Sequence, residues 1–162
     1  MRALIQRVGG AKVSVNGEVV SSIGKGLCVL IGINRDDGPK DLEYIVRKIL
    51  NVRLFDDESG VRWKCSAKEK QLEILCVSQF TLYHELKGNK PDFHNSMGPD
   101  AAKTFYSTFL DELKKQYNPA LIKDGKFGEY MKVEIDNDGP VTIMLESLNS
   151  KGKGGNDKND TA

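Results

Sequence analysis

The sequence of 162 residues has little of what marks a metalloprotein, a disulfide-stabilised domain or a membrane protein. It contains two histidines and three cysteines, and Cys28, Cys65 and Cys76 lack the spacing of a metal site. Cys28 and Cys76 lie in apolar runs, which predicts small buried side chains in a reducing compartment. The longest apolar run, residues 27–33, is too short to cross a bilayer. We therefore predict no metal and no contact with a membrane.

Three further features are missing, and each narrows the function. No glycine-rich phosphate loop of a nucleotide-binding type is present, so we expect no cofactor. The first fifteen residues resemble neither a signal peptide nor a transit peptide, which favours the cytoplasm. Lysine and arginine number 24 against 23 acidic residues, and this balance argues against a protein that coats long nucleic acids. A protein that grips a single nucleic-acid end stays possible.

The pattern of apolar residues predicts one α/β domain. Residues 2–33 have the alternation of strands, with a two-residue hairpin turn at Asn16-Gly17. Helical spacing follows Pro39 and again follows Pro99, and the second helix ends at Asn118-Pro119. The other predicted strands cover residues 52–55, 72–80, 130–135 and 141–145. The expected fold is a set of layered β-sheets packed with two main helices on one side.

The predicted domain ends at residue 146. Residues 147–162 are almost all Gly, Lys, Asn and Asp, a composition that predicts a disordered polar tail. Within the domain, residues 83–97 form a long polar loop with Gly and Pro, and its length suggests a function.

Two short segments place small polar groups where a ligand could meet them. In SQFTL, residues 78–82, an apolar strand ends in hydroxyl and amide side chains, although such residues at a strand end are also ordinary. In NDGPVT, residues 137–142, Asn137 opens a tight turn that joins two strands, and Pro140 begins the second of them. The Gly139-Pro140 bond is of the kind that adopts the cis form at modest cost. A plain turn is the alternative.

The usual catalytic arrangements are not evident. His84 and His94 both lie in the long loop, so neither is assured of a place beside a serine or threonine hydroxyl. Lysines and aromatic residues alternate around this loop and near residues 123–132, which suits stacking on a terminal nucleotide and contact with its phosphate. A solvated lysine surface over core aromatics is the alternative.

With these segments in place, the chain resembles the D-aminoacyl-tRNA deacylases. SQFTL and NDGPVT are similar to the two signature motifs of that family, and residues 2–8, 87–93 and 124–128 are similar to its framing segments. The resemblance covers residues 1–146. It implies a hydrolase that cleaves the ester of D-aminoacyl-tRNA, with the aminoacylated 3′ end of tRNA as its partner. The competing hypothesis is a nucleic-acid-binding or replication-associated interaction protein without catalysis.

The resemblance also implies where the substrate lies. The active sites are expected at the interface of a homodimer, where Ser78, Gln79 and Phe80 form one wall of the amino-acid pocket. A cis Gly139-Pro140 reaches in from the other subunit, binds the α-amino group and excludes L side chains, and Arg7 supports its orientation. Glycyl-tRNA, which has no side chain to exclude, becomes a plausible second substrate. Residues similar to Phe127 and Met131 surround the terminal adenosine in this family.

The mechanism has two versions at this point. Water could attack with help from the adjacent ribose hydroxyl of the tRNA, while backbone N–H groups near Phe80 and Thr81 stabilise the oxyanion. Thr81 could instead act as a covalent nucleophile. The first is favoured because no base for Thr81 is evident.

Overall fold

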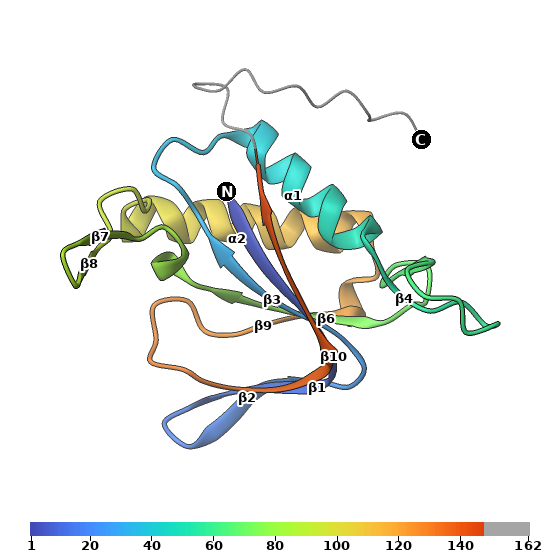
Figure 1. The fold of residues 1–162 in the computed structure, drawn as a ribbon. Coiled ribbons are helices and arrows are strands. Elements are labelled where there is room, and N and C mark those ends of the chain that lie inside the picture. The colour runs from blue at the N-terminus through green and yellow to red at the C-terminus, as the bar shows by residue number, and fades with distance from the viewer. Residues whose placement is uncertain (148–162) are drawn as a thin grey trace.

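A computed structural model describes residues 1–147 of the chain, and its centre is one mixed six-stranded sheet (Figure 1). The strand order is β10-β1-β3-β6-β9, and β2 pairs with β1. β3, β6 and β9 run parallel, while β1 is antiparallel to β2, β3 and β10. The sheet strands are β1 (Arg2–Val15), β2 (Glu18–Ile23), β3 (Gly26–Gly32), β6 (Glu73–Ser78), β9 (Ile122–Asp124) and β10 (Lys132–Glu146).

Two helices lie within the connections between the parallel strands. A parallel pair needs a long crossover, and α1 (Pro39–Asn51) lies in the β3–β6 connection as α2 (Pro99–Gln116) lies in the β6–β9 connection. Both helices therefore pack on the same face of the sheet (Figure 1). The shorter elements are β4 (Arg53–Phe55), β5 (Cys65–Ser66), η1 (Phe80–Leu82), β7 (Glu85–Lys87), β8 (Lys90–Asp92) and η2 (Pro119–Leu121).

The two faces of the sheet bury two apolar clusters. One lies between the sheet and the helices and contains Ile45, Ile49 and Phe109. The other lies on the opposite face, where Val8, Val13 and other strand residues pack. β1 and β10 are long and bend, so that with β2 they fold over this second face (Figure 1). The predicted β/β/α layering is confirmed, with a single curved sheet supplying both β layers.

The turn predicted at Asn16-Gly17 is confirmed. Asn16 has a φ of 51° and Gly17 a φ of 80°, the left-handed conformations of a two-residue hairpin turn. The predicted buried strand is also confirmed, because every residue of β3 except Leu30 is buried.

The interpretation of residues 137–140 as a turn between two strands is wrong. β10 is one strand that pairs with β1 on both sides of this segment. Gln6 pairs with Thr142 and Val8 pairs with Asn137, so four residues of β10 oppose Arg7 alone. Turn-forming residues here loop out of a continuing strand as a bulge and do not reverse the chain.

Two other segments differ from the prediction in their boundaries. The loop at residues 83–97 contains the hairpin of β7 and β8, whose short strands lie mostly in solvent and so lack an alternating pattern. The strand expected over 72–80 ends at Ser78, and Phe80 begins a turn of 3-10 helix.

The folded chain extends one residue past the predicted domain end. Ser147 is buried, and its N–H donates to the Met1 carbonyl at 2.8 Å. The rest of the predicted tail, residues 148–162, lies outside the described residues. No helix within residues 1–147 has the length and apolar character needed to span a membrane.

Candidate active site

The first signature segment opens into a mainly apolar pocket. Ser78 at the end of β6, followed by Gln79 and Phe80, forms one wall. Phe93 and the segment from Ser96 to the start of α2 also line the pocket. The Phe80 and Phe93 rings meet edge to face with their centroids 5.0 Å apart. The predicted wall of Ser78, Gln79 and Phe80 is thus placed on a single cavity.

The backbone of this wall is fixed from both ends. The Gln79 N–H donates to the Ile31 carbonyl at 2.7 Å, which continues the pairing of β6 with β3. The Ser96 hydroxyl donates to the Phe80 carbonyl at 2.8 Å, and Arg2 Nη1 donates to the Leu82 carbonyl at 2.6 Å. The η1 turn is therefore held rigidly, with its first N–H groups unpaired within the turn.

Thr81 does not line the pocket, and its hydroxyl is bonded to a neighbouring side chain. The Gln79 side-chain amide donates to Thr81 Oγ1. His84 Nδ1 lies 3.1 Å from the Thr81 backbone carbonyl, while His94 contacts Asp92. Across residues 1–147, neither histidine contacts a hydroxyl of Ser78 or Thr81, so the geometry provides no base for a nucleophile.

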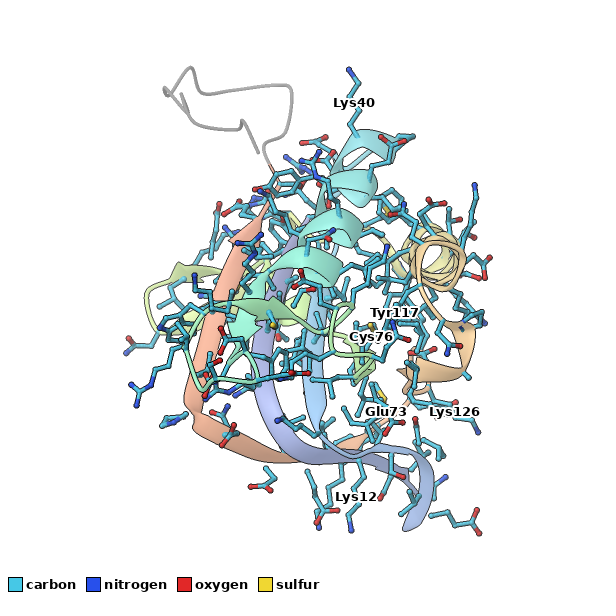
Figure 2. The ribbon with its side chains drawn as sticks, turned by 90° about the vertical axis from the view of Figure 1, so that its right-hand side faces the viewer. Lys12, Lys40, Glu73, Cys76, Tyr117 and Lys126 are labelled. Carbon is cyan, nitrogen blue, oxygen red and sulfur yellow. The ribbon has the colours of Figure 1, made fainter. Side chains whose placement is uncertain are left out.

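A third side of the pocket comes from the segment after β9. Phe127 and Gly128 line the cavity there. Met131 lies against this segment, and its sulfur accepts from the backbone N–H of Lys126 at 3.3 Å. Lys126 itself points away from the fold into solvent (Figure 2). The expected adenosine residues are therefore placed together, with Phe127 on the cavity and Met131 supporting the segment.

The second signature segment forms an exposed bulge that polar side chains fix to β1. The Gly139-Pro140 bond is cis. Asn137 Nδ2 donates to the carbonyls of Arg7 and Val141, each at 3.1 Å. These bonds close the base of the bulge and leave Gly139 and Pro140 at the surface.

Arg7 lies against the bulge. Its Nη1 donates to the Leu54 carbonyl at 2.7 Å. Its Nε is 3.0 Å from Asp138 Oδ2, an ion pair whose geometry falls short of a hydrogen bond. A Cβ on Gly139 would lie 3.0 Å from Arg7 Nη2, so the guanidinium and the bulge are in close contact.

The pocket and the bulge lie on opposite sides of one chain. Ser78 is aligned through β3 and β1 with Leu145 of β10, five residues from Pro140. Five residues along a strand and three strand spacings together correspond to a separation of roughly 20 Å. In Figure 1, η1 and the β7–β8 hairpin lie on one side, and β4 and the bend of β10 lie on the other. Residues 139–140 therefore cannot line the pocket of their own chain.

Several pocket residues escaped prediction from the sequence. They come from the end of β3 and the residue after it, from the segment before α2 and from the first turns of that helix: Ile31, Ile33, Ser96, Met97, Gly98, Pro99 and Ala102. The only signal was the unusual length of the loop at residues 83–97. Most of them are apolar and look like ordinary core residues until the fold places them at a cavity.

The described residues thus form a mainly apolar pocket with one wall fixed by hydrogen bonds, an arrangement suited to binding and orienting a ligand. The family model "D-Tyr-tRNA(Tyr) deacylase" matches residues 4–146. The chain belongs to this family.

Relatives and solved structures agree with that assignment. D-aminoacyl-tRNA deacylase of Drosophila melanogaster is 62% identical over 93% of this chain and 95% of its own length. D-aminoacyl-tRNA deacylase 1 of Homo sapiens is 61% identical over 91% of this chain and 70% of its own. A structure titled "c-Myc DNA Unwinding Element Binding Protein" has a TM-score of 0.89 at 61% identity, covering 91% of this chain and 99% of that one. A second, of a probable eukaryotic D-amino acid tRNA deacylase, has a TM-score of 0.76 at 21% identity, covering 90% and 98%, and so supports the fold.

Proposed function

We propose that this protein hydrolyses the ester bond of D-aminoacyl-tRNA and releases the D-amino acid and the tRNA. Family membership and two relatives above 60% identity, both named D-aminoacyl-tRNA deacylase, support this activity. The observation that carries it is the fixed wall of Ser78, Gln79 and Phe80 on a pocket whose other side is Phe127. We place this activity in the cytoplasm, where aminoacyl-tRNA is used.

The pocket suits the aminoacylated 3′ end of a tRNA. Phe127 offers an aromatic ring on which the terminal adenine can stack. The aminoacyl group then lies toward Ser78 and the η1 turn. Backbone N–H groups of Phe80 and Thr81 are available at the start of that turn to stabilise an oxyanion.

A second copy of the chain completes each site. Gly139 and Pro140 are exposed on the single chain and lie far from its own pocket. Phe80 leaves 59% of its surface exposed at the mouth of that pocket. In a two-fold dimer the bulge of one chain covers the pocket of the other, and the same contact occurs twice.

Sedimentation equilibrium should therefore give a mass near twice the 18.0 kDa of the chain at micromolar concentration. A site built from two chains loses its bulge on dissociation. Specific activity should therefore fall when the protein is diluted to concentrations at which the dimer dissociates. Full activity from a species with the monomer mass would contradict the shared site.

The completed site would select handedness by exclusion. A rigid bulge that holds the α-amino group leaves space for a side chain in one direction only, so an L side chain would collide with backbone. Glycine has no side chain, and we therefore include glycyl-tRNA among the substrates. The same exclusion explains how one pocket accepts many D side chains that point out of it.

The chemistry needs little from protein side chains. Water attacks the ester carbonyl carbon, the bond to the ribose oxygen breaks, and that oxygen leaves with a proton. The adjacent ribose hydroxyl of the tRNA assists the attack. The protein contributes orientation and the backbone donors, consistent with a Thr81 hydroxyl that is bonded to Gln79 and has no base beside it.

Incubation of catalytic amounts of the protein with matched D-, L- and glycyl-tRNA tests this proposal. We expect the D-aminoacyl and glycyl esters to be hydrolysed and the L-aminoacyl ester to be left intact. Equal hydrolysis of D and L substrates would contradict selection by exclusion, and hydrolysis of none would contradict the enzyme.

The alternative of a nucleic-acid-binding protein without catalysis is not favoured. A similar structure carries a title that names DNA binding. This chain has a net charge of only +1, whereas affinity for duplex DNA comes mainly from many phosphate contacts. DNA binding that persists at physiological salt, together with inactivity on D-aminoacyl-tRNA, would restore the alternative.

A further inference from the structure

Few backbone hydrogen bonds join the segment that carries Phe127 to the rest of the fold. Its first residue, Gly125, donates from N–H to the Cys76 carbonyl of β6 at 3.1 Å. A second backbone hydrogen bond, from the Glu129 N–H to the Lys126 carbonyl at 3.2 Å, is internal to the segment. Its position against the pocket therefore depends on what holds Asp124 and the Phe127 ring.

Both of these are held by one residue of α2. The Tyr106 hydroxyl donates to Asp124 Oδ1 at 2.6 Å. The Tyr106 ring lies 5.7 Å from the Phe127 ring, centroid to centroid, at an angle of 38°. Tyr106 is 3% exposed, so its hydroxyl has been taken from water and pairs with a single carboxylate. One side chain thus contacts the segment at its start and again at its pocket residue.

We propose that Tyr106 and Asp124 are positioning residues that set the Phe127 wall of the pocket and thereby the affinity for the terminal nucleoside of the substrate. This inference rests on the proposed function. Neither residue lines the cavity, so both would act through Phe127 and Gly128.

The physical reason is the cost of removing one donor from a half-buried carboxylate. Burial raises the pKa of Asp124, while the hydrogen bonds from the Tyr106 hydroxyl and the Gly125 N–H, together with the nearby Lys114, lower it. Without the Tyr106 hydroxyl, the carboxylate replaces this bond with hydration by moving toward solvent, and Phe127 is three residues along the same chain. Phe127 would contact the nucleoside and not the ester, so displacement should weaken binding and leave the chemical step intact.

Tyr106→Phe is the sharpest test because it removes the hydroxyl and keeps the ring against Phe127. The matched control is Tyr117→Phe, which also removes a tyrosine hydroxyl bonded within the fold. Tyr117 lies just after α2, donates to the Leu72 carbonyl at 2.7 Å and does not line the pocket.

We expect Tyr106→Phe to raise KM for D-aminoacyl-tRNA by about three- to tenfold, the effect of one lost hydrogen bond, with kcat within about twofold of the wild type. Tyr117→Phe should lower the unfolding midpoint about as much as Tyr106→Phe does, because each variant loses one hydrogen bond, but it should leave KM unchanged. Asp124→Asn keeps an oxygen acceptor for the Tyr106 hydroxyl and should retain a KM close to the wild-type value. Asp124→Ala should raise KM as Tyr106→Phe does.

Equal KM values for Tyr106→Phe and Tyr117→Phe would overturn the positioning role and leave the pair purely structural. A fall in kcat at unchanged KM for Tyr106→Phe would overturn it as well. The wild-type protein distinguishes failure of the positioning role from failure of the proposed function. If the proposed function is wrong, the wild type itself does not hydrolyse D-aminoacyl-tRNA.

Discussion

Gly139→Ala should lower the rate of D-aminoacyl-tRNA hydrolysis by about 100-fold, the loss expected when a substrate is displaced by about 1 Å. Gly139 has a φ of 114°, where an L side chain is strained. Its Cβ would lie 3.0 Å from both Arg7 Nη2 and Val141 Cγ2. The bulge must shift to accept the methyl group, and single-turnover rates at saturating enzyme measure the consequence.

Gly17→Ala is the control for backbone strain. Gly17 also has a left-handed conformation, with a φ of 80°, but its Cβ would have no atom within 4 Å. It lies in the β1–β2 hairpin, away from the bulge and the pocket. We expect both variants to lose roughly 1–2 kcal/mol of unfolding free energy and only Gly139→Ala to lose activity. Wild-type rates for a folded Gly139→Ala protein would show that the bulge has no part in the site.

Mixing a bulge variant with a pocket variant can show which chain supplies the bulge. Gly139→Ala has an intact pocket, and Phe80→Ala, which we expect to lose activity because Phe80 lines the pocket, has an intact bulge. A mixed dimer of the two contains one site with both parts intact, so equilibration should restore about one quarter of the sites. A bulge that served its own chain would give no recovery on mixing.

A tRNA that ends in 2′-deoxyadenosine, with the D-amino acid on the 3′ oxygen, should be hydrolysed at least about 100-fold more slowly, the usual contribution of an acid–base group. Among the described residues, none that lines the pocket has a side chain able to act as such a group. Thr81 Oγ1 accepts from Gln79, and His84 faces the Thr81 carbonyl and not its hydroxyl. Equal rates on deoxy and normal substrates at saturation would remove the ribose hydroxyl from the mechanism.

Thr81→Ala is the companion measurement on the protein. We expect its rate to stay within about tenfold of the wild type, because loss of one supporting hydrogen bond costs about 1 kcal/mol. A fall of about 1,000-fold, together with an acyl-enzyme trapped on the wild-type protein, would instead identify Thr81 as a nucleophile.

Local signals in the sequence predicted most elements of the fold. Asn16-Gly17 specified its hairpin because few other residues accept two left-handed conformations in succession. The continuous apolar run at residues 26–33 became the buried β3, and the prolines at 39 and 99 each began a helix. The prediction of a turn between two strands at residues 137–140 was wrong. The same residues form a turn or a bulge, and only the pairing of β10 with β1 on both sides decides between them.

The sequence by itself determined the family, both long helices, most of the longer strands and the two signature segments, because motifs and periodicity are local. The tertiary structure decided how these segments lie relative to each other. It placed Ser78, Gln79, Phe80 and Phe127 on one cavity and set Gly139 and Pro140 on the far side of the same sheet. It also brought Tyr106 of α2 against Asp124, a contact with no local signature. Contacts between distant segments depend on the packing of the whole chain, which no short stretch of sequence encodes.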